Sequence, residues 1–208
     1  MMKNASLLLA LIFCCTLKTS LNAQATFGVK AAVNAAQVNS HITTDIDGIR
    51  TDEFDVKLKP QLGFWYHLPL SARFSLQPEL LWTQKSLRSK EQTGEVVFDY
   101  FSLPVLLNYQ FRKFTFELGP EFSFLLDQRF ADKNSVLTES PFIKEHVFEL
   151  AINLGLRYQL NRWLIGLRAT HDVTPFDSFE FTEVNGEPVG EVKFFHRGLQ
   201  LALGYQLF

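Results

Sequence analysis

The feature that most constrains this fold is a strict alternation of apolar and polar side chains over long stretches. The segment RFSLQPELLWTQ (73–84) shows it: Phe74, Leu76, Pro78, Leu80 and Trp82 take one set of positions, and Arg73, Ser75, Gln77 and Glu79 fill the places between. Successive side chains of an extended strand point to opposite faces, so this segment has one apolar and one polar face. No segment after residue 25 sustains the 3.6-residue period of a helix.

Alternation of this kind defines eight predicted strands, at 26–38, 56–68, 72–87, 95–111, 114–128, 144–160, 163–174 and 191–208. Soluble strands usually run about 5–6 residues, whereas membrane-spanning strands need about 9–11. Tight turns (68–71, 112–113, 160–162) alternate with longer polar connections (39–55, 88–94, 129–143, 175–190). The sequence therefore predicts an all-β fold: an eight-stranded antiparallel up-and-down transmembrane β-barrel with short periplasmic turns and longer extracellular loops.

A soluble ligand carrier of eight strands would show the same alternation with the faces exchanged. Two features favour the membrane. The apolar face of the later strands is almost entirely Leu and Phe, and the chain contains 21 Phe residues. Aromatic residues also cluster beside the short turns, as in an interfacial girdle: Tyr66, Phe74, Tyr109, Phe111, Phe114, Tyr158, Trp163 and Tyr205.

The N-terminus has the pattern of a secretory signal. Lys3 precedes an apolar centre at 5–17, and small residues at 21–25 offer a cleavage site. We predict a cleaved signal peptide at 1–23, or ending at 25, and a barrel domain at 24–208, exported to the outer membrane. Cys14 and Cys15 leave with the signal, so the mature chain has no disulfide. The formal charge of −2, without a basic block, argues against nucleic acid as a partner.

The polar face carries balanced charge at positions inside the strands. The expected lumen network comprises Lys30, Arg73, Arg157 and Arg168 against Glu79, Glu117, Glu121 and Glu149. Side chains can just fill an eight-stranded barrel, and an unpaired ion in a dry interior costs several kcal/mol. We therefore predict a structural plug of ion pairs; a polar conduit is the alternative.

Four prolines fall inside predicted strands: Pro60, Pro78, Pro104 and Pro120. A proline removes one hydrogen bond from the ladder. A closed barrel has no edge strand, which is where a sheet usually accommodates a proline. The sequence predicts β-bulges at these positions.

Several segments resemble successive strands of the PorT-type outer-membrane β-barrel family: FGVKAAVNAA (27–36), KPQLGFWYHLPLSARFSLQPELLWTQKS (59–86), SLPVLLNYQF (102–111) and FELGPEFSFLL (116–126). The resemblance spans essentially the whole mature chain. It implies a small outer-membrane barrel of Gram-negative, gliding-type bacteria, and the founding member is linked to type IX secretion. The chain departs from the barrel pattern at Phe208, which is out of phase with the apolar face of the last strand.

Enzymatic and metal-binding patterns are weak. A rim site could use His171, Asp172, Ser178 and Asp99, but no spacing brings a nucleophile to its base. His67, His146 and His196 lie on separate strands without zinc spacing. The segment 45–53 lacks the ligand order of a calcium loop. We predict no catalytic residue, metal or cofactor.

The resulting hypothesis is a monomeric, non-enzymatic barrel with a plugged polar lumen, embedded in outer-membrane lipid. It would act through protein partners of a secretion or envelope machinery, with type IX secretion implied by the resemblance. The alternatives are a rim-active lipid-modifying enzyme and a small-solute pore, which the barrel size disfavours.

Overall fold

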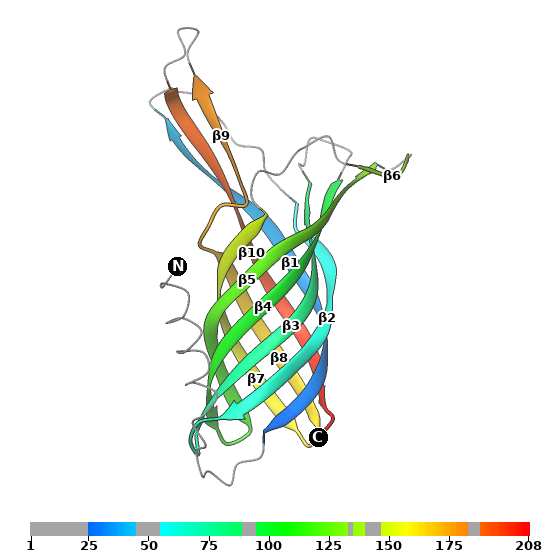
Figure 1. Cartoon of the computed structure of the whole chain (residues 1–208), viewed down its shortest axis with the longest axis vertical. Coiled ribbons are helices and arrows are strands. Elements are labelled where there is room, and N and C mark those ends of the chain that lie inside the picture. The colour runs from blue at the N-terminus through cyan, green and yellow to red at the C-terminus, as the bar shows by residue number, and fades with distance from the viewer. Residues whose placement is uncertain (1–24, 45–54, 89–94, 133–134, 140–146, 183–187) are drawn as a thin grey trace, which may run out of the picture.

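Eight antiparallel strands close into a ring in the computed structural model (Figure 1). It describes residues 25–44, 55–88, 95–132, 135–139, 147–182 and 188–208. The barrel strands are β1 (Thr26–Thr44), β2 (Lys57–Pro69), β3 (Phe74–Leu87), β4 (Glu95–Phe111), β5 (Phe114–Asp132), β7 (Phe148–Leu160), β8 (Trp163–Asp172) and β10 (Pro188–Gln206). Each barrel strand pairs with its neighbour along the chain, and β1 closes the ring by pairing with β10 from Gly28↔Gln206 to Thr44↔Gly190. The predicted eight-stranded antiparallel up-and-down barrel is confirmed, and ring closure leaves no free strand edge in the barrel wall, as a membrane-spanning sheet requires.

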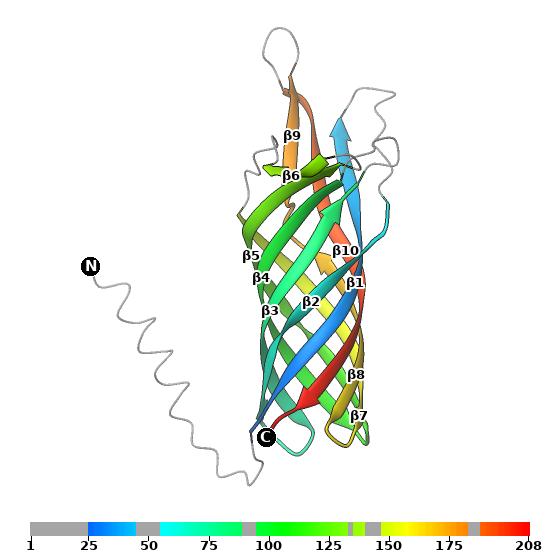
Figure 2. The same cartoon turned by 90° about the vertical axis from the view of Figure 1, so that its right-hand side faces the viewer.

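Two short strands lie in segments that the sequence predicted as loops. β6 (Ser135–Glu139) pairs with β5, and β9 (Asp177–Thr182) pairs with β10. The loop prediction was wrong there because β1, β5 and β10 each run for 19 residues, past the end of the barrel, and offer backbone groups that need partners. The outer parts of β1 and β10 form with β9 a three-stranded blade above the long-loop end (Figures 1 and 2). The described residues include no helix long and apolar enough to cross a membrane.

The short connections lie together at the opposite end of the barrel, beside the C-terminus (Figure 2). The loops 112–113 and 161–162 each contain a residue with positive φ, Arg112 at 57° and Asn161 at 55°. Positive φ at the first loop residue suits the twist of a two-residue hairpin. The first short connection is 70–73, because β2 continues to Pro69. It therefore lies two residues later than the predicted turn at 68–71.

Pro78, Pro104 and Pro120 lie beside interruptions that leave the register unchanged, and Pro60 lies in an unbroken β1–β2 ladder, so the prediction of bulges at these sites was wrong. Between β2 and β3, pairing stops after Trp65↔Glu79 and resumes at Leu68↔Leu76, with the same offset. Similar interruptions lie beside Pro104 and Pro120. At the interruption beside Pro120, the backbone of Gly119 lies very close to β4. A Cβ on residue 119 would lie 2.0 Å from the Val105 carbonyl oxygen, so this position requires a glycine. The one register shift in the β4–β5 ladder lies at Asp99/Tyr100, away from any proline.

The outer face of the barrel is apolar and the inner face is polar, which is the arrangement that a membrane requires. Large apolar side chains cover the outside, with Leu154 62% exposed and Leu201 62% exposed. Charged side chains such as Glu79 and Arg168 are buried inside. A soluble carrier would show the reverse arrangement. Aromatic pairs line the short-turn end, among them Phe74–Tyr109, Phe114–Tyr158 and Trp163–Tyr205 at ring-centroid distances of 4.9 to 5.2 Å.

Phe208 also joins this aromatic belt, although the sequence pattern put it out of phase. β10 ends at Gln206, so the alternation of that strand no longer orients the last residue. The Phe208 ring stacks on Phe27 at 5.5 Å, and Phe27 stacks in turn on Phe64. The Phe27 amide donates a hydrogen bond of 2.8 Å to the Phe208 carbonyl.

Candidate functional site: the polar lumen

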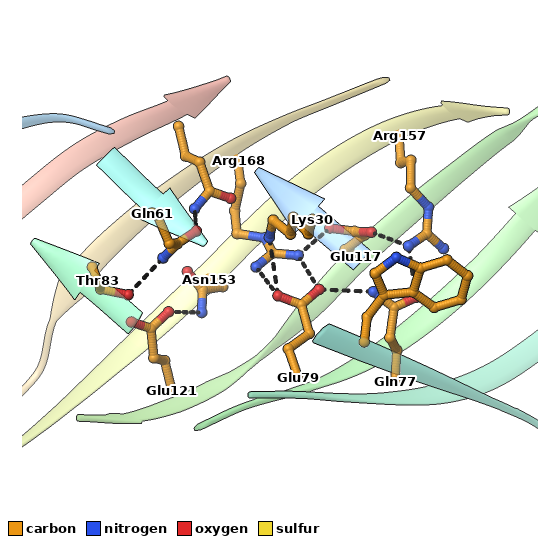
Figure 3. Close-up of polar contacts among 12 residues, drawn as sticks. Lys30, Gln61, Gln77, Glu79, Thr83, Glu117, Glu121, Asn153, Arg157 and Arg168 are labelled. Atoms are coloured by element: carbon orange, nitrogen blue, oxygen red, sulfur yellow. Dashed lines mark hydrogen bonds and ion pairs between the residues drawn. The ribbon is translucent and has the colours of Figure 1, made fainter. Parts of the chain in front are cut away.

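Charged and amide side chains from six strands meet in the half of the lumen nearer the short turns (Figure 3). We call this set the Arg168 cluster: Lys30, Gln77, Glu79, Asn108, Glu117, Arg157 and Arg168. Each lies three to five positions from the short-turn end of its strand. Each also occupies a position whose side chain points into the barrel, because side chains alternate between the two faces of a strand. Local strand geometry therefore brings them to one level of the barrel.

Arg168 holds the centre of this cluster. Its guanidinium donates two hydrogen bonds to Glu79, of 2.9 and 2.8 Å, and a third of 2.8 Å to Glu117. The Lys30 ammonium lies 2.9 Å from a Glu79 oxygen. Bidentate pairing of arginine with a carboxylate is among the stronger charge-assisted contacts, and it fixes the orientation of both groups.

Arg157 and Gln77 extend the cluster toward the short-turn mouth. Arg157 Nη1 lies 3.0 Å from Glu117 and donates a 2.6 Å hydrogen bond to the Gln77 side-chain oxygen. Gln77 in turn donates to Glu79 at 2.7 Å and accepts from Asn108 at 3.1 Å. Each carboxylate thus meets at least two donors, as buried charges require.

The Arg168–Glu79 contact crosses the full width of the barrel. Arg168 is on β8 and Glu79 on β3, which are four strands apart in a ring of eight. A side chain that reaches the opposite wall fills the axis between them. The cavity beside this cluster has a volume of about 20 Å³, roughly the space of one water molecule.

A second group, the Glu149 cluster, lies nearer the long-loop end: Lys85, Tyr100, Glu149, Asp172 and His196. Lys85 Nζ lies 2.9 Å from Glu149 and 3.6 Å from Asp172. The Tyr100 hydroxyl donates to the other Glu149 oxygen. His196 donates its backbone amide to Asp172 at 2.9 Å and places Nδ1 3.2 Å from the same oxygen.

Apolar side chains cover the Glu149 cluster on its outer side. Val38, Val96, Phe98, Tyr100 and Phe176 form a buried apolar cap at the long-loop end. The Phe176 ring stacks on His196 at 4.0 Å. Because these charges are buried beneath the cap, their ion pairs are strengthened and the penalty for leaving one unpaired grows.

Glu121 lies between the two clusters and differs from its predicted role as an ion-pair member. It accepts hydrogen bonds from Asn153 at 2.9 Å and Ser123 at 3.3 Å. No lysine or arginine among the described residues lies within 4.0 Å of its carboxylate. The neighbouring cavity, of about 40 Å³, is lined by Glu121, Lys85 and Asp172 among others.

Arg73 is the predicted network residue that the structure places elsewhere. It is exposed in the connection before β3, and its guanidinium makes no ion pair within the described part of the chain. Arg73 lies an even number of residues from Gln77 and Glu79, so alternation predicted that it also points inward. Alternation orients side chains only inside a strand, and β3 begins one residue after Arg73. Of the other seven predicted residues, five meet in the Arg168 cluster, Glu149 centres the second cluster, and Glu121 lies between them.

Four members of the Glu149 cluster were not predicted from the sequence to belong to the lumen network: Lys85, Tyr100, Asp172 and His196. The alternation contained the signal for three of them. Each lies an even number of residues along its strand from a polar position on the inner face: Lys85 from Glu79, Asp172 from Arg168, and His196 from Gln200. Tyr100 was hidden because an aromatic residue in a predicted membrane strand is expected to face lipid.

Among the described residues, the four candidates for a rim enzyme do not form one site. His171 and Asp172 are adjacent in β8 and therefore point to opposite faces, outward and inward. Asp99 pairs instead with Arg129 and accepts a 3.0 Å hydrogen bond from Gln84. Ser178 lies in β9, on the blade. His146 and the segment 45–53 fall outside the described residues.

Glu149, Asp172 and His196 offer three potential metal-ligand atoms within 4.8 Å of one another. The Lys85 ammonium already lies against both carboxylates. A divalent cation would therefore have to displace a paired lysine, which makes a metal centre an unfavourable use of this group.

Comparison with known proteins gives one family and several related folds. The family model described as "Outer membrane protein beta-barrel domain" matches residues 20–178. Neisserial surface protein A (NspA) is 10% identical with a TM-score of 0.53, and the match covers 89% of this chain and 100% of that one. A comparison with curated protein sequences found no match.

Two further solved structures are similar at lower scores. Ail, the attachment invasion locus protein of Yersinia pestis, is 12% identical over 89% of this chain and 100% of its own, with a TM-score of 0.49. OprG from Pseudomonas aeruginosa is 15% identical over 88% and 95%, with a TM-score of 0.48. At these identities the likeness concerns the fold alone, and we base it on NspA.

Proposed function

The chain belongs to the outer membrane protein beta-barrel domain family, and from that premise we propose a non-enzymatic barrel with a closed lumen that acts through protein partners at the outer membrane. The single observation that carries the closed lumen is the Arg168–Glu79 contact between opposite walls. Two cavities beside the lumen charges, described for this part of the chain, have volumes of about 20 and 40 Å³. A pore that passes solutes needs a continuous aqueous path, which these volumes do not offer.

This proposal predicts negligible conductance. We expect the purified wild-type barrel in planar bilayers to show no steady ion current, because paired side chains occupy the axis. A variant with the Arg168 cluster opened, Arg168→Ala with Glu79→Ala, should conduct if it folds, which makes it the matched control. A steady, ion-selective current through the wild type would overturn the closed lumen.

We further propose that the short turns face the periplasm and the blade faces the exterior, as in other outer-membrane barrels. Export would require a signal peptide at 1–23, or ending at 25, and the mature chain would be a monomer. A PorT-type identity, with a role in type IX secretion, belongs to the same proposal; the sequence motifs support it.

The blade supports the partner part of the proposal on the exterior side. Residues 38–44 of β1 pair with β10, whereas the last β1–β2 pair is Ala36↔Lys57. In the described part of the chain, this leaves one edge of the blade without a neighbouring strand. An edge strand of this kind can bind an extended segment of another protein through backbone hydrogen bonds.

Cross-linking in the native membrane tests for such a partner. A photoreactive residue at His41, which is exposed on the blade, should give a discrete adduct of higher mass. The same residue at Leu201, on the lipid face, serves as the control and should give none. If adducts form at neither position, or equally at both, the blade is not a partner surface.

The lipid-modifying enzyme gains no support from the described residues. His196 contacts Asp172, as a catalytic base would, but the apolar cap covers it and its Nε2 has no hydrogen-bond partner. A hydrolase or acyltransferase needs a nucleophile within hydrogen-bond reach of that nitrogen.

A further inference from the structure

The short-turn mouth of the barrel contains an open vestibule of about 300 Å³, far larger than either cavity deeper in the lumen. Its lining includes Trp65, His67, Arg73, Thr115, Arg157 and Gln159. Two guanidinium groups, an imidazole, amides and hydroxyls therefore face this space, and none of the lining residues is an aspartate or glutamate. The carboxylate of Glu117 lies deeper in the lumen and is already bound by Arg157 and Arg168.

The two arginines of the vestibule keep donors free for a ligand. The described contacts of Arg157 engage Nη1 alone, which leaves Nη2 and Nε without a partner. The Arg73 guanidinium makes no ion pair in the described part of the chain. Two guanidinium groups with N–H donors available, beside amide and hydroxyl donors, are suited to bind carboxylates.

Positive charge continues around the mouth. The two hairpin loops carry Arg112, Lys113 and Arg162, all exposed, and the connection 70–73 carries Arg73. No acidic residue lies in any of the three short connections. The chain as a whole is slightly acidic, with a formal charge of −2, so this end is a local concentration of positive charge. Such a field attracts anionic ligands and speeds their association.

We propose that this vestibule binds an acidic peptide segment of a periplasmic protein, with Arg73 and Arg157 holding its carboxylates. Inward-facing side chains such as Trp65, Thr115 and Leu164 line the vestibule, whereas headgroups of a surrounding membrane would contact the outer wall. Trp65, Phe74 and Leu164 add apolar lining that a bare phosphate would not use. The volume of about 300 Å³ is larger than one small ion would fill. The inference deepens the proposed function, since it depends on protein partners and on periplasmic short turns.

Fluorescence anisotropy on the full barrel in neutral detergent tests the site with a labelled Glu-rich decapeptide. The wild type should bind this peptide and not a Gln-rich peptide of equal length. Raising the salt from 50 to 500 mM should weaken binding at least tenfold, because the exposed charges are screened. Arg73→Gln should weaken it about five- to tenfold, and adding Lys113→Gln should weaken it further.

Lys193→Gln is the matched control. It removes the same unit of charge from the exposed blade at the other end, where Lys193 pairs with Glu191, and should leave binding unchanged. Equal binding by wild type and Arg73→Gln, or no preference over the Gln-rich peptide, would overturn the proposal. Arg73-dependent binding to vesicles of anionic lipid without peptide binding would also overturn it, in favour of a headgroup site. A conducting wild type would instead contradict the closed lumen, so the two failures are distinguishable.

Discussion

Replacing Arg168 with methionine is expected to destabilise the folded barrel by about 3–5 kcal/mol, the usual cost of removing one partner from a buried ion pair. The substitution removes the three charge-assisted hydrogen bonds that hold Glu79 and Glu117. Lys30 and Arg157 remain, so both carboxylates keep one cation but lose the central one. Reversible urea unfolding in lipid vesicles, followed by tryptophan fluorescence, measures the change in the free energy of unfolding.

Three further variants separate pairing from mere packing. Arg73→Met removes an exposed arginine and should change stability by no more than about 0.5 kcal/mol. Glu121→Gln keeps the acceptor for Asn153 and removes a charge with no described cation within 4.0 Å, so its cost should stay near about 1 kcal/mol. Combining Arg168→Met with Glu79→Gln should recover part of the loss, because the two groups interact directly. Additive losses in that double variant would mean that Arg168 stabilises the barrel through packing alone.

Replacing Leu154 with arginine is expected to cost about 2–4 kcal/mol in a bilayer, as charged residues do at the midplane of a barrel wall. Leu154 lies midway along β7 with 62% of its surface exposed on the outside of the barrel. The guanidinium would therefore enter hydrocarbon rather than protein. The same unfolding measurement in vesicles reports the cost.

Depth provides the matched control for this prediction. Leu160 is exposed on the same strand but at its short-turn end, so Leu160→Arg should cost only about 0–1 kcal/mol. Asn153, the inward neighbour of Leu154, is fully buried between Glu121 and Thr170. If Leu154→Arg and Leu160→Arg had equal effects, the outer wall would not sample a bilayer as we describe.

Local pattern alone was sufficient for the barrel itself. Strand existence, strand number and the inward or outward direction of each side chain depend on a period of two, which neighbouring residues encode. Glu79, Glu117 and Arg168 could be assigned to the lumen for this reason. The same rule fails outside a strand. Arg73 precedes β3 and Phe208 follows β10, so neither side chain points in the direction that alternation predicted. It also could not show that β1, β5 and β10 continue beyond the barrel, because the polar loops there carry weak alternation.

Which lumen residues meet was decided by the tertiary structure alone. Arg168 and Glu79 are 89 residues apart and come from opposite walls, so their contact depends on ring closure and on the register of every ladder between them. One shifted register would move Arg168 to another level of the barrel, away from Glu79. The same holds for Lys85 and Glu149, 64 residues apart. Parity is a local property of the backbone and can be read from sequence, whereas pairing across a lumen is set by the stagger of the whole barrel.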